Sequence, residues 1–439
     1  MKTQALKIVR KLQEQNHEAV FAGGCVRDLI LKLDPQDYDV ATSAKPDQVE
    51  ALFEHTVSVG KTFGVIVVVM DGFEIEVATF RSDSLTSDGR RPDSVTFTSM
   101  EEDAKRRDLT INGMFWDPIA DKILDYVGGQ QDLKDGLIRL IGDPDARLIE
   151  DKLRLMRVVR FASRFNFKVV PETLEAVKKH SHEIIQVSSE RIGEELIKIL
   201  RTGNYRTAFN LLFETNLIEY ILPEIKAMKG VEQPVDYHPE GDVLAHTLLA
   251  LESLPANASD ELRMGVLLHD VGKPLTQTFE DRIRFSQHEL KGKDLAREIL
   301  KRLKYSNEFT EFVVELVGNH MKFMHVKEMR VSKLKRFMAM PKFEEHLALH
   351  RADCASSHKH LINYDFIKEK FENYTPEEIR ITPDTRILTG NDLLSMGYKA
   401  GPLFREILTD VEDQQLEGVI SDKDQALKYV TEKYPNHKN

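Results

Sequence analysis

Segments with the character of β-strands almost vanish after the first 170 of the 439 residues. VIVVVM (65–70) and FEIEVATF (73–80) are joined by Asp71-Gly72, a pair typical of a two-residue hairpin turn. EAVFAGG (18–24) and DYDVAT (37–42) are also typical of short strands. From about residue 145 helical patterns dominate, beginning with RLIEDKLRLMRVVRFASRF (147–165). This asymmetry predicts an α/β head with a small mixed sheet, followed by helical domains.

A chain of 439 residues is too long for one domain, since about 100–200 residues is usual. We predict a head over 1–144, a helical neck and RNA-binding region over 145–225, a histidine-rich helical domain over 226–370 and a helical tail over 371–439. No apolar run approaches the ~18 residues of a membrane span, so no membrane partner is expected. Two cysteines cannot build a disulfide framework, which favours a cytoplasmic location.

Paired carboxylates on two predicted strands indicate a metal site in the head. Asp37 and Asp39 are two residues apart, and Glu74 and Glu76 follow on a later strand. Residues two apart on a strand share one face. Like charges held that close are tolerated when they are exposed or bind a divalent cation. The pattern therefore leaves open an exposed acidic strand end, but a third carboxylate from a neighbouring strand would complete a two-metal site for nucleotidyl transfer.

Features suited to phosphate surround these carboxylates. Gly23-Gly24 ends a strand before an amphipathic segment, and such a turn exposes backbone N–H groups. Arginine-rich segments follow at 81–97 and 102–113, and a guanidinium can bind two phosphate oxygens at once. The net charge of −11 does not exclude a nucleic-acid partner, because a local basic groove is sufficient.

Several of these segments belong to a longer ordered series of motifs. In chain order they are GGCVRD, DYDVAT, EVATFR, RRPDSVTF, RRDLTINGM, GDPDARLIEDKLRLMRVVRFA and SSERIGEEL. Over residues 18–225 this series resembles the bacterial-type (class II) tRNA nucleotidyltransferase and poly(A) polymerase family. The resemblance implies a polymerase-β-like head, a helical neck and two-metal transfer of a nucleotide onto an RNA 3′ end.

The resemblance also implies roles for individual residues. Asp37 and Asp39 would bind Mg²⁺, with Glu76 as the third carboxylate and Glu74 left over. The segment from Arg81 to Arg91 matches the family's flexible loop, which helps to switch from C to A addition. The residues expected to hold the triphosphate and ribose of the incoming nucleotide are Gly23, Gly24, Arg27, Arg107, Asp108 and Asn112.

The EDKLR motif (150–154) supplies the most specific functional prediction. Asp151 and Arg154 are three residues apart, which on a helix makes them neighbours, and an ordinary surface ion pair is the alternative. In the resembled family this motif replaces a nucleic-acid template. A carboxylate offers acceptors and a guanidinium donors, which matches the pairing edges of C and A but not those of U and G. Glu150 would buttress Arg154, and Arg157 and Arg160 would face nucleotide or RNA phosphates.

A second set of residues lies in the histidine-rich block. LLHDVGKP (267–274) and its surroundings resemble the HD phosphohydrolase family. That resemblance implies a site for a divalent transition metal such as Ni²⁺ or Mn²⁺, because imidazole and carboxylate suit such ions. The matching ligands are His246, His269, Asp270 and Asp353, with His288 and His320 matching the extra histidines of binuclear versions.

Together these patterns favour an enzyme that adds C, C and A to the tRNA 3′ end from CTP and ATP, with an HD phosphohydrolase attached. A poly(A) polymerase, or an enzyme that adds only CC or only A, is the alternative within the family. An HD phosphohydrolase with an inactive RNA-binding head is a third possibility. The acidic C-terminal segment DVEDQQLEGVISDKDQ favours tRNA over poly(A) synthesis, because poly(A) polymerases of this type tend to carry a basic extension. We expect a monomer or a homodimer.

Overall fold

The computed structural model describes residues 1–83, 95–234, 238–357 and 360–435. The chain divides into two compact units. One comprises Met1–Ala227 and Ile299–Ser306, and the other comprises Met228–Glu298 and Asn307–Asn439. The division after Ala227 falls close to the boundary expected at 225–226. The finer four-part division of the chain stays a prediction.

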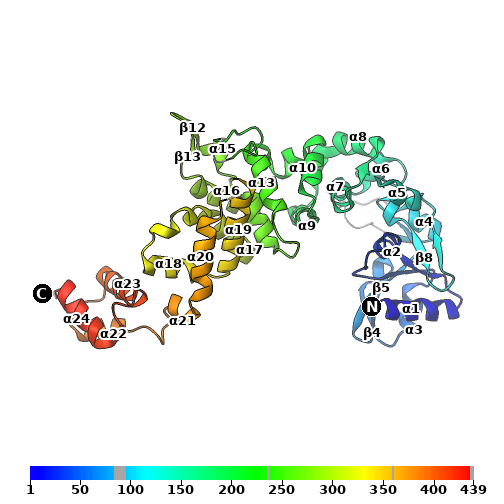
Figure 1. Cartoon of the computed structure of the whole chain (residues 1–439). Helices are drawn as coiled ribbons and strands as arrows, with labels where there is room; N and C mark the ends of the chain where they lie inside the picture. The colour runs from blue at the N-terminus through cyan, green and yellow to red at the C-terminus, as the bar shows by residue number, and fades with distance from the viewer. Residues whose placement is uncertain (84–94, 235–237, 358–359, 436–439) are drawn as a thin grey trace. The chain divides into compact units, whose positions relative to one another are not determined.

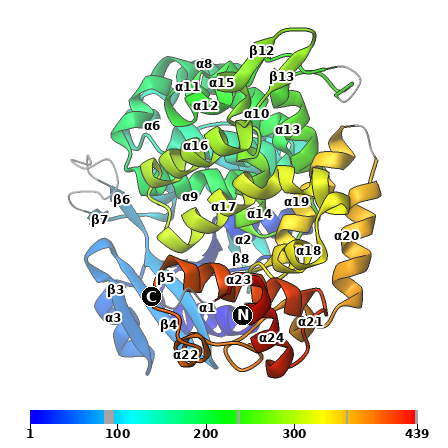
Figure 2. The same ribbon diagram turned by 90° about the vertical axis from the view of Figure 1, so that its left-hand side faces the viewer.

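The first unit contains the mixed sheet predicted for the head (Figure 1). Among the described residues its strand order is β3-β4-β5-β2-β1-β8-β9, and the β2–β5 pairing is parallel while the others are antiparallel. Figure 2 shows β3, β4 and β5 side by side. The strands span Ala19–Ala22 (β1), Asp39–Thr42 (β2), Thr56–Gly60 (β3), Val65–Met70 (β4), Phe73–Thr79 (β5), Phe115–Asp117 (β8) and Lys122–Leu124 (β9).

Helices cover both faces of this sheet. On one face lie α1 (Lys2–Glu14) and α3 (Pro46–Leu52), and α1 buries Ala5, Ile8, Val9 and Leu12, the spacing of a single helical stripe. On the other face α4 (Met100–Lys105) contributes to a core of small and aromatic side chains. That core comprises Val20, Ala22, Ala41, Phe80, Met100, Ala104 and Phe115.

The turn chemistry expected from the sequence is present. Asp71 and Gly72 both have positive φ, 51° and 81°, and connect Met70 to Phe73 as a two-residue hairpin. Gly23, with φ 70°, separates β1 from α2 (Gly24–Ile30). The expected flexible loop is only partly described: β6 (Arg81–Asp83) and β7 (Val95–Phe97) flank it, and residues 84–94 lie outside the described residues.

The neck that follows is helical, as predicted, but the EDKLR motif is not one helical turn. One helix ends at Glu150, Asp151 is extended (φ −143°, ψ 104°) and the next helix begins at Arg154. Two short strands, β10 (Leu137–Ile138) and β11 (Lys168–Val169), pair beside these helices. The helices are α5 (Gly129–Asp135), α6 (Pro144–Glu150), α7 (Arg154–Phe165), α8 (Pro171–His180), α9 (Ser189–Leu200), α10 (Tyr205–Glu214), α11 (Leu217–Ile221) and α12 (Pro223–Lys226).

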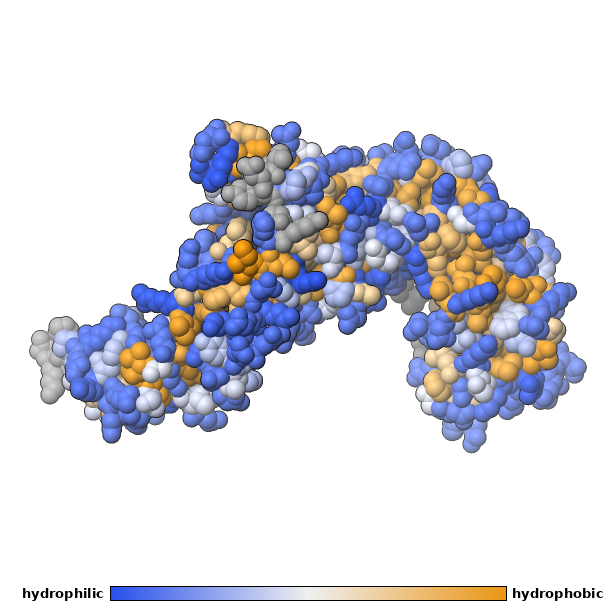
Figure 3. Space-filling view, viewed as in Figure 1, coloured by the Kyte–Doolittle hydropathy of each residue, from blue (hydrophilic) through white to orange (hydrophobic). Residues whose placement is uncertain are grey.

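The second unit is built from helices and one small hairpin, β12 (Gln277–Phe279) with β13 (Ile283–Phe285). No helix in its described parts, or in those of the first unit, is long and apolar enough to cross a membrane. Most residues on the visible face of the tail helices are hydrophilic (Figure 3). The helices are α13 (Val243–Glu252), α14 (Asp260–Leu268), α15 (Lys273–Thr276), α16 (His288–Arg302), α17 (Asn307–Asn319), α18 (Val331–Met338), α19 (Phe343–Ser356), α20 (Ile362–Asn373), α21 (Pro376–Ile379), α22 (Gly390–Ser395), α23 (Pro402–Leu416) and α24 (Lys423–Lys433).

Candidate functional site

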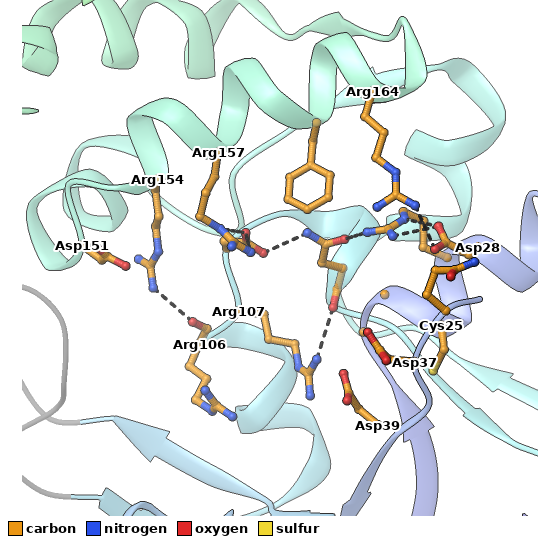
Figure 4. Close-up of a pocket in the computed structure, with 17 residues that line it drawn as sticks. Cys25, Asp28, Asp37, Asp39, Arg106, Arg107, Asp151, Arg154, Arg157 and Arg164 are labelled. Carbon is orange, nitrogen blue, oxygen red and sulfur yellow. Dashed lines mark hydrogen bonds and ion pairs between the residues drawn. The ribbon is translucent and has the colours of Figure 1, made fainter. Parts of the chain in front are cut away.

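A cavity of about 550 Å³ in the first unit brings together most of the residues singled out from the sequence (Figure 4). It lies between the adjoining ends of strands β1 and β2, the segment 106–112 and helix α7. Six arginines and five aspartates stand among its described lining residues, so it suits a ligand that carries both negative charge and hydrogen-bonding groups. The lining comprises Gly23, Gly24, Cys25, Arg27, Asp28, Gln36, Asp37, Asp39, Arg106, Arg107, Asp108, Asn112, Asp151, Arg154, Arg157, Phe161 and Arg164.

Asp37 and Asp39 lie side by side at one wall of this cavity (Figure 4). Asp39 is the first residue of β2, whereas Asp37 precedes the strand. The expectation that both lie on the strand is therefore wrong for Asp37, although both face the cavity. Val40 pairs with Val77 in the parallel β2–β5 ladder, which places Glu76 directly beside Asp39. Glu74 shares that face but lies two residues earlier on the strand, so the sheet register separates the two glutamates.

The electrostatics of Asp39 reflect these neighbours. Removal of water by the cavity walls raises its pKa, and the negative charges of Glu76 and Asp37 raise it further, to about 6. Arg107 acts in the opposite direction. A carboxylate that neighbouring carboxylates make harder to ionise is relieved by a cation, and oxygen ligands suit Mg²⁺. Asp37, Asp39 and Glu76 therefore fit a divalent metal site by the chemistry of their donors.

A buried hydrogen-bond network fixes the segment 106–112 opposite these carboxylates. Arg107 donates through Nη2 to Asp103 Oδ2 at 3.0 Å and through Nη1 to the carbonyl oxygen of Asn112 at 3.4 Å. Arg157 Nε donates to Asp108 Oδ2 at 2.6 Å, and Asn112 Nδ2 donates to Asp108 Oδ1 at 3.2 Å. Burial alone would raise the pKa of Asp108, but Arg157 and Asn112 lower it to about 2, so the group is ionised.

Gly23 is required by the approach of one of these arginines. With φ 70° it occupies a region that favours glycine, and a Cβ there would lie 2.8 Å from Arg107 Nη1. The glycine turn and the arginine-rich segment, 84 residues apart in sequence, therefore meet at the cavity.

Arg27 has a more internal position than the sequence indicated. Its residue is 3% exposed, its Nε donates to Asp28 Oδ1 at 2.8 Å and its Nη1 to Asn112 Oδ1 at 2.5 Å. The guanidinium also lies over the rings of Phe161 and Phe165, at 5.2 and 4.9 Å from their centres. These contacts make it a support for Asn112 as much as a free phosphate donor.

Asp151 and Arg154 both project into the same end of the cavity (Figure 4). Arg154 Nη1 donates to Glu150 Oε2 at 2.8 Å, which is the buttressing contact expected from the sequence. Both carboxylate oxygens of Asp151 lie 3.3 Å from Arg191 Nη2, and its Oδ1 accepts from the backbone N–H of Leu153 at 3.1 Å. A set of acceptors and a set of donors thus lie side by side in a part-buried setting, where a mismatched partner would leave charged groups unpaired.

Two expected residues, Glu76 and Arg160, are not among the described lining residues of the cavity. Arg160 is outside the described lining because its Nη1 bonds the buried carboxylate of Glu195 at 2.8 Å. Among the lining residues, Asp28, Gln36, Arg106 and Phe161 were not assigned roles from the sequence, and Arg164 was expected only as one of the recurring helix arginines of which some face phosphates. Arg164 lies two helical turns beyond Arg157 on α7, and that periodicity was the available signal.

A second candidate site lies within the second unit, in its bundle of helices. The site consists of six residues from five segments of this bundle, and all except Asp353 are at most 5% exposed. They are His246 on α13, His269 and Asp270 at the end of α14, His288 at the start of α16, His320 after α17 and Asp353 on α19.

These residues form two groups, each with ligand atoms within 4.8 Å of one another. His246, His269 and Asp353 make one group, and Asp270, His288 and His320 make the other. Asp270 touches both, because its Oδ2 lies 3.2 Å from His269 Nε2 and its Oδ1 lies 3.3 Å from His288 Nε2. The six residues expected from the sequence therefore converge, with one carboxylate shared between two three-ligand clusters.

Hydrogen bonds on the outer side of three rings fix which nitrogen faces the cluster. A carbonyl oxygen can only accept, so the Nδ1 atom bonded to it carries the proton and the Nε2 atom of the neutral ring presents a lone pair. These bonds join His269 to Val266 at 2.8 Å, His288 to Phe285 at 2.9 Å and His320 to Val317 at 2.6 Å.

The inward-facing atoms lie close enough together to share a cation. His288 Nε2 and His320 Nε2 lie 3.0 Å apart. Burial and the neighbouring His288 lower the pKa of His320 to about 3, so this ring is neutral and can act as a ligand. Imidazole nitrogens and a carboxylate in this arrangement fit a divalent transition metal.

His246 differs because carboxylates flank both of its ring nitrogens. Its Nδ1 lies 2.7 Å from Glu240 Oε1 and its Nε2 lies 3.1 Å from Asp353 Oδ1. Burial would lower its pKa, but these two hydrogen bonds raise it to about 9. Glu240 was not singled out from the sequence, and it fills the outer position that carbonyl oxygens fill for the other three rings.

Three family descriptions match the chain. The "Poly A polymerase head domain" matches residues 19–139, the "Probable RNA and SrmB- binding site of polymerase A" matches 166–229, and "tRNA nucleotidyltransferase domain 2 putative" matches 285–430. The first of these ranges contains the carboxylates and the arginine-rich segment of the head cavity.

Curated relatives match about half of the chain or slightly more. A CCA-adding enzyme of Bacillus pumilus is 45% identical over 218 residues, which cover 49% of this chain and 54% of the relative. The CCA-adding enzyme of Bacillus subtilis is 41% identical over 272 residues, covering 61% and 65%. Poly(A) polymerase I of Salmonella typhi is 40% identical over 232 residues, covering 50% of each. The chain thus spans about half the length of the curated relatives it matches.

Solved structures resemble the whole chain. The Bacillus stearothermophilus CCA-adding enzyme in complex with CTP superposes with a TM-score of 0.76 and 27% identity, over 98% of this chain and 96% of that one. A Thermotoga maritima CCA-adding enzyme complexed with tRNA superposes with a TM-score of 0.60 and 19% identity, over 98% of this chain and 94% of that one. At that identity the likeness supports the fold alone. The predicted fold class, a polymerase-β-like head followed by helical domains, is confirmed. Three domain descriptions match in order and relatives of 40–45% identity cover about half of the chain, which confirms the resemblance to the tRNA nucleotidyltransferase and poly(A) polymerase family expected from the sequence.

Proposed function

We propose that the chain adds C, C and A to the 3′ end of tRNA, using CTP and ATP. The observation that carries this proposal is the convergence in one cavity of metal-type carboxylates, a triphosphate-type arginine segment and the Asp151/Arg154 pair. The likeness to CCA-adding enzymes, one of them in complex with CTP, supports it. Free, buried thiols at Cys25 and Cys354 support a cytoplasmic setting.

Asp37, Asp39 and Glu76 would hold Mg²⁺. The bound ions supply charge neutralisation and activation of the attacking RNA hydroxyl, as in other two-metal sites. The carboxylates stand at the wall opposite Arg107 and Asn112, so the α-phosphate of a nucleotide would lie between the two sets. Arg107 neutralises phosphate charge, and its anchor on the buried Asp103 keeps its guanidinium in place.

Selection of the base would rest on Asp151 and Arg154. The exocyclic amino group of C or A donates to the Asp151 carboxylate, and the neighbouring ring nitrogen accepts from the Arg154 guanidinium. U and G present the reverse order, so a donor would face Arg154 and an acceptor would face Asp151. Each mismatch in a part-buried site leaves a charged group without a partner, which is a strong basis for rejection.

Poly(A) polymerase remains the alternative within the family, because 232 residues of the chain are also 40% identical to poly(A) polymerase I of Salmonella typhi. Addition of only CC or only A is a further outcome to be distinguished. One assay separates these cases: tRNA lacking its 3′ end is incubated with Mg²⁺ and with CTP and ATP, singly and together, and the products are sized. CCA addition predicts two added residues with CTP alone and three with both.

Asp37→Ala tests the metal site of the head in the same assay. We expect a folded protein without nucleotide addition, because the substitution removes a metal ligand but no buried core contact. Glu74→Ala, a carboxylate on the same sheet face but displaced along β5, is the matched control and should retain addition. Near-normal nucleotide addition by Asp37→Ala would refute the proposal that these carboxylates bind the catalytic metal.

We propose a second activity, metal-dependent hydrolysis of phosphoesters, for the histidine cluster of the second unit. The specific observation that favours it is the sharing of Asp270 between two three-ligand groups, which suits a binuclear site. Enzymes of the resembled HD type act on 2′,3′-cyclic phosphates, 2′-nucleotides and other phosphoesters. Ni²⁺ and Mn²⁺ are the first ions to test.

The test measures bound metal as well as hydrolysis. Wild-type protein should bind close to two equivalents of Ni²⁺ or Mn²⁺ in this unit, and Asp270→Ala should lose metal and hydrolysis while nucleotide addition persists. His350→Phe is the matched control, because His350 is buried on the same helix as Asp353 and stacks on Phe323 instead of facing the cluster. A wild-type protein that binds no metal in this unit would refute the second activity. An inactive head with an active cluster would instead support a phosphohydrolase that only binds RNA.

A further inference from the structure

Arg147 is a buried arginine that joins two parts of the head cavity. It lies on α6, three residues before Glu150, and is 9% exposed. Its Nη2 donates to the backbone carbonyl oxygens of Arg106 and Arg107, at 2.6 Å in the case of Arg107. Its Nη1 donates to Glu150 Oε2. One planar guanidinium therefore bonds three acceptors from two segments that are 40 residues apart in sequence.

The two segments have different tasks in the proposed reaction. Arg106 and Arg107 directly precede Asp108, in the stretch that would hold the sugar and the triphosphate. Glu150 Oε2 also accepts from Arg154 Nη1 at 2.8 Å, and Arg154 Nη1 donates to the carbonyl oxygen of Arg147 at 2.7 Å. Arg147 is thus bonded on one side to the backbone of the phosphate-binding stretch and on the other to the guanidinium that would read the base.

We propose that Arg147 is a positioning residue that sets the separation between the base-reading pair, Asp151 and Arg154, and the stretch that holds the triphosphate. The inference rests on the proposed nucleotide addition. A nucleotide fixed at its phosphates can present only one base edge to a pair held at a fixed distance. If the separation varies by even about 1 Å, wrong bases can shift into hydrogen-bonding range and correct ones lose alignment.

The geometry of the guanidinium explains why an arginine stands at this position. Its planar fork donates to two adjacent carbonyl oxygens and a carboxylate at the same time, whereas a lysine ammonium is a point charge on a flexible stem. Lysine would keep the charge next to Glu150 but could not hold the two carbonyl groups in register with it. Methionine would fill much of the same volume with no donor at all.

The test compares Arg147→Lys and Arg147→Met with the wild type on tRNA that lacks its 3′ end. The kcat/KM values for CTP, ATP, UTP and GTP are measured for each protein, together with its thermal melting curve. We expect the ratio of kcat/KM for CTP over UTP to fall about tenfold in Arg147→Met, equivalent to about 1.4 kcal/mol. The same ratio should also fall in Arg147→Lys, but by a smaller factor.

Arg263→Met is the matched control. Arg263 is also a buried arginine, 4% exposed, and its Nη2 donates to the carbonyl oxygen of Ala256 at 2.7 Å, but it lies on α14 in the second unit. The Arg263→Met substitution should lower the melting temperature without changing the ratio of kcat/KM for CTP over UTP. That combination separates loss of stability from loss of selectivity.

An equal loss for all four nucleotides, with the CTP/UTP ratio unchanged in the Arg147 variants, would overturn the inference and leave a purely structural role. If Arg147→Met does not fold, the ratio measured for Arg147→Lys decides in the same way. Absence of addition by the wild type would refute the proposed function itself, and the inference with it.

Discussion

Asp39→Asn should stabilise the metal-free protein while abolishing nucleotide addition. In the structure the pKa of Asp39 is raised from 3.8 to about 6, first by loss of water at the cavity wall and then by Glu76 and Asp37. A folded state that binds this proton more tightly than the unfolded state is penalised once the group ionises. The penalty is therefore fully present above pH 6 and disappears as the pH falls from 6 to 4.

The size of the effect follows from the shift. About two pKa units correspond to about 3 kcal/mol at 1.36 kcal/mol per unit. Because the side chain is also open to solvent on one side, screening reduces the expected gain to about 1 kcal/mol. For a unit of this size the melting temperature should rise by about 2–4 °C at pH 7.5 in EDTA. At pH 5, where Asp39 of the wild type is largely protonated, the gain should be about half as large.

The assay is thermal melting of wild type and Asp39→Asn at pH 7.5 and pH 5, in EDTA and in saturating Mg²⁺. Bound Mg²⁺ should stabilise the wild type and reverse the order, since a ligand stabilises the state that binds it. Asp71→Asn is the control, because Asp71 lies in the hairpin of the same sheet, has a lowered pKa from its hydrogen bond with Lys7, and should not gain stability when neutralised. A lower melting temperature for Asp39→Asn in EDTA at pH 7.5 would refute the charge-repulsion argument.

Three further substitutions test other parts of the two sites. Glu76→Gln should reduce kcat for nucleotide addition by at least about 100-fold while Glu74→Gln stays near the wild type, because the register places only Glu76 beside Asp39; equal effects would contradict that assignment. Asp151→Ala should narrow the preference for CTP and ATP over UTP and GTP by about 1.5–3 kcal/mol, measured as incorporation of all four nucleotides, and unchanged selectivity would end the template proposal. Glu240→Gln should weaken metal binding in the second unit by about tenfold in a chelator competition, since it orients His246, and unaltered affinity would show that this contact is dispensable.

Local features of the head were predictable because neighbouring residues determine them. The Asp71-Gly72 turn needs two residues that tolerate positive φ, and the sequence supplies them between two apolar runs. The alternation on β5 likewise fixes Glu74 and Glu76 on one face. What alternation alone could not supply is the register with β2, which depends on a partner 37 residues away in sequence.

The break in the EDKLR motif shows a second limit. Leu148, Leu155, Met156 and Val159 continue an apolar pattern across 148–159, so periodicity alone predicts one helix. The signal for the break was present in Asp151 itself, whose Oδ1 accepts from the Leu153 backbone N–H just before the second helix begins. An aspartate before an apolar run is a helix-start signal, so Asp151 also indicates that a new helix begins after it.

Arginine side chains were the least predictable part of the site. Arg154, Arg157, Arg160 and Arg164 recur along α7, yet Arg160 is drawn away from the cavity by the buried Glu195. Its direction is decided by a carboxylate on α9, and nothing in the local sequence indicates that contact. The same holds for Arg147, whose role depends on carbonyl groups 40 residues earlier in the chain.

The parallel pairing of β2 with β5 has a consequence for how the head can vary. The chain between these two strands forms α3, β3 and β4, and β3 and β4 are the outermost strands on that side of the sheet. The position of Asp39 relative to Glu76 depends on the Val40–Val77 register and not on the length of that intervening chain. The turn at Asp71-Gly72 is therefore a suitable place to insert a peptide tag or a fluorescent reporter, because extra chain there projects from the sheet without altering the spacing of Asp39 and Glu76.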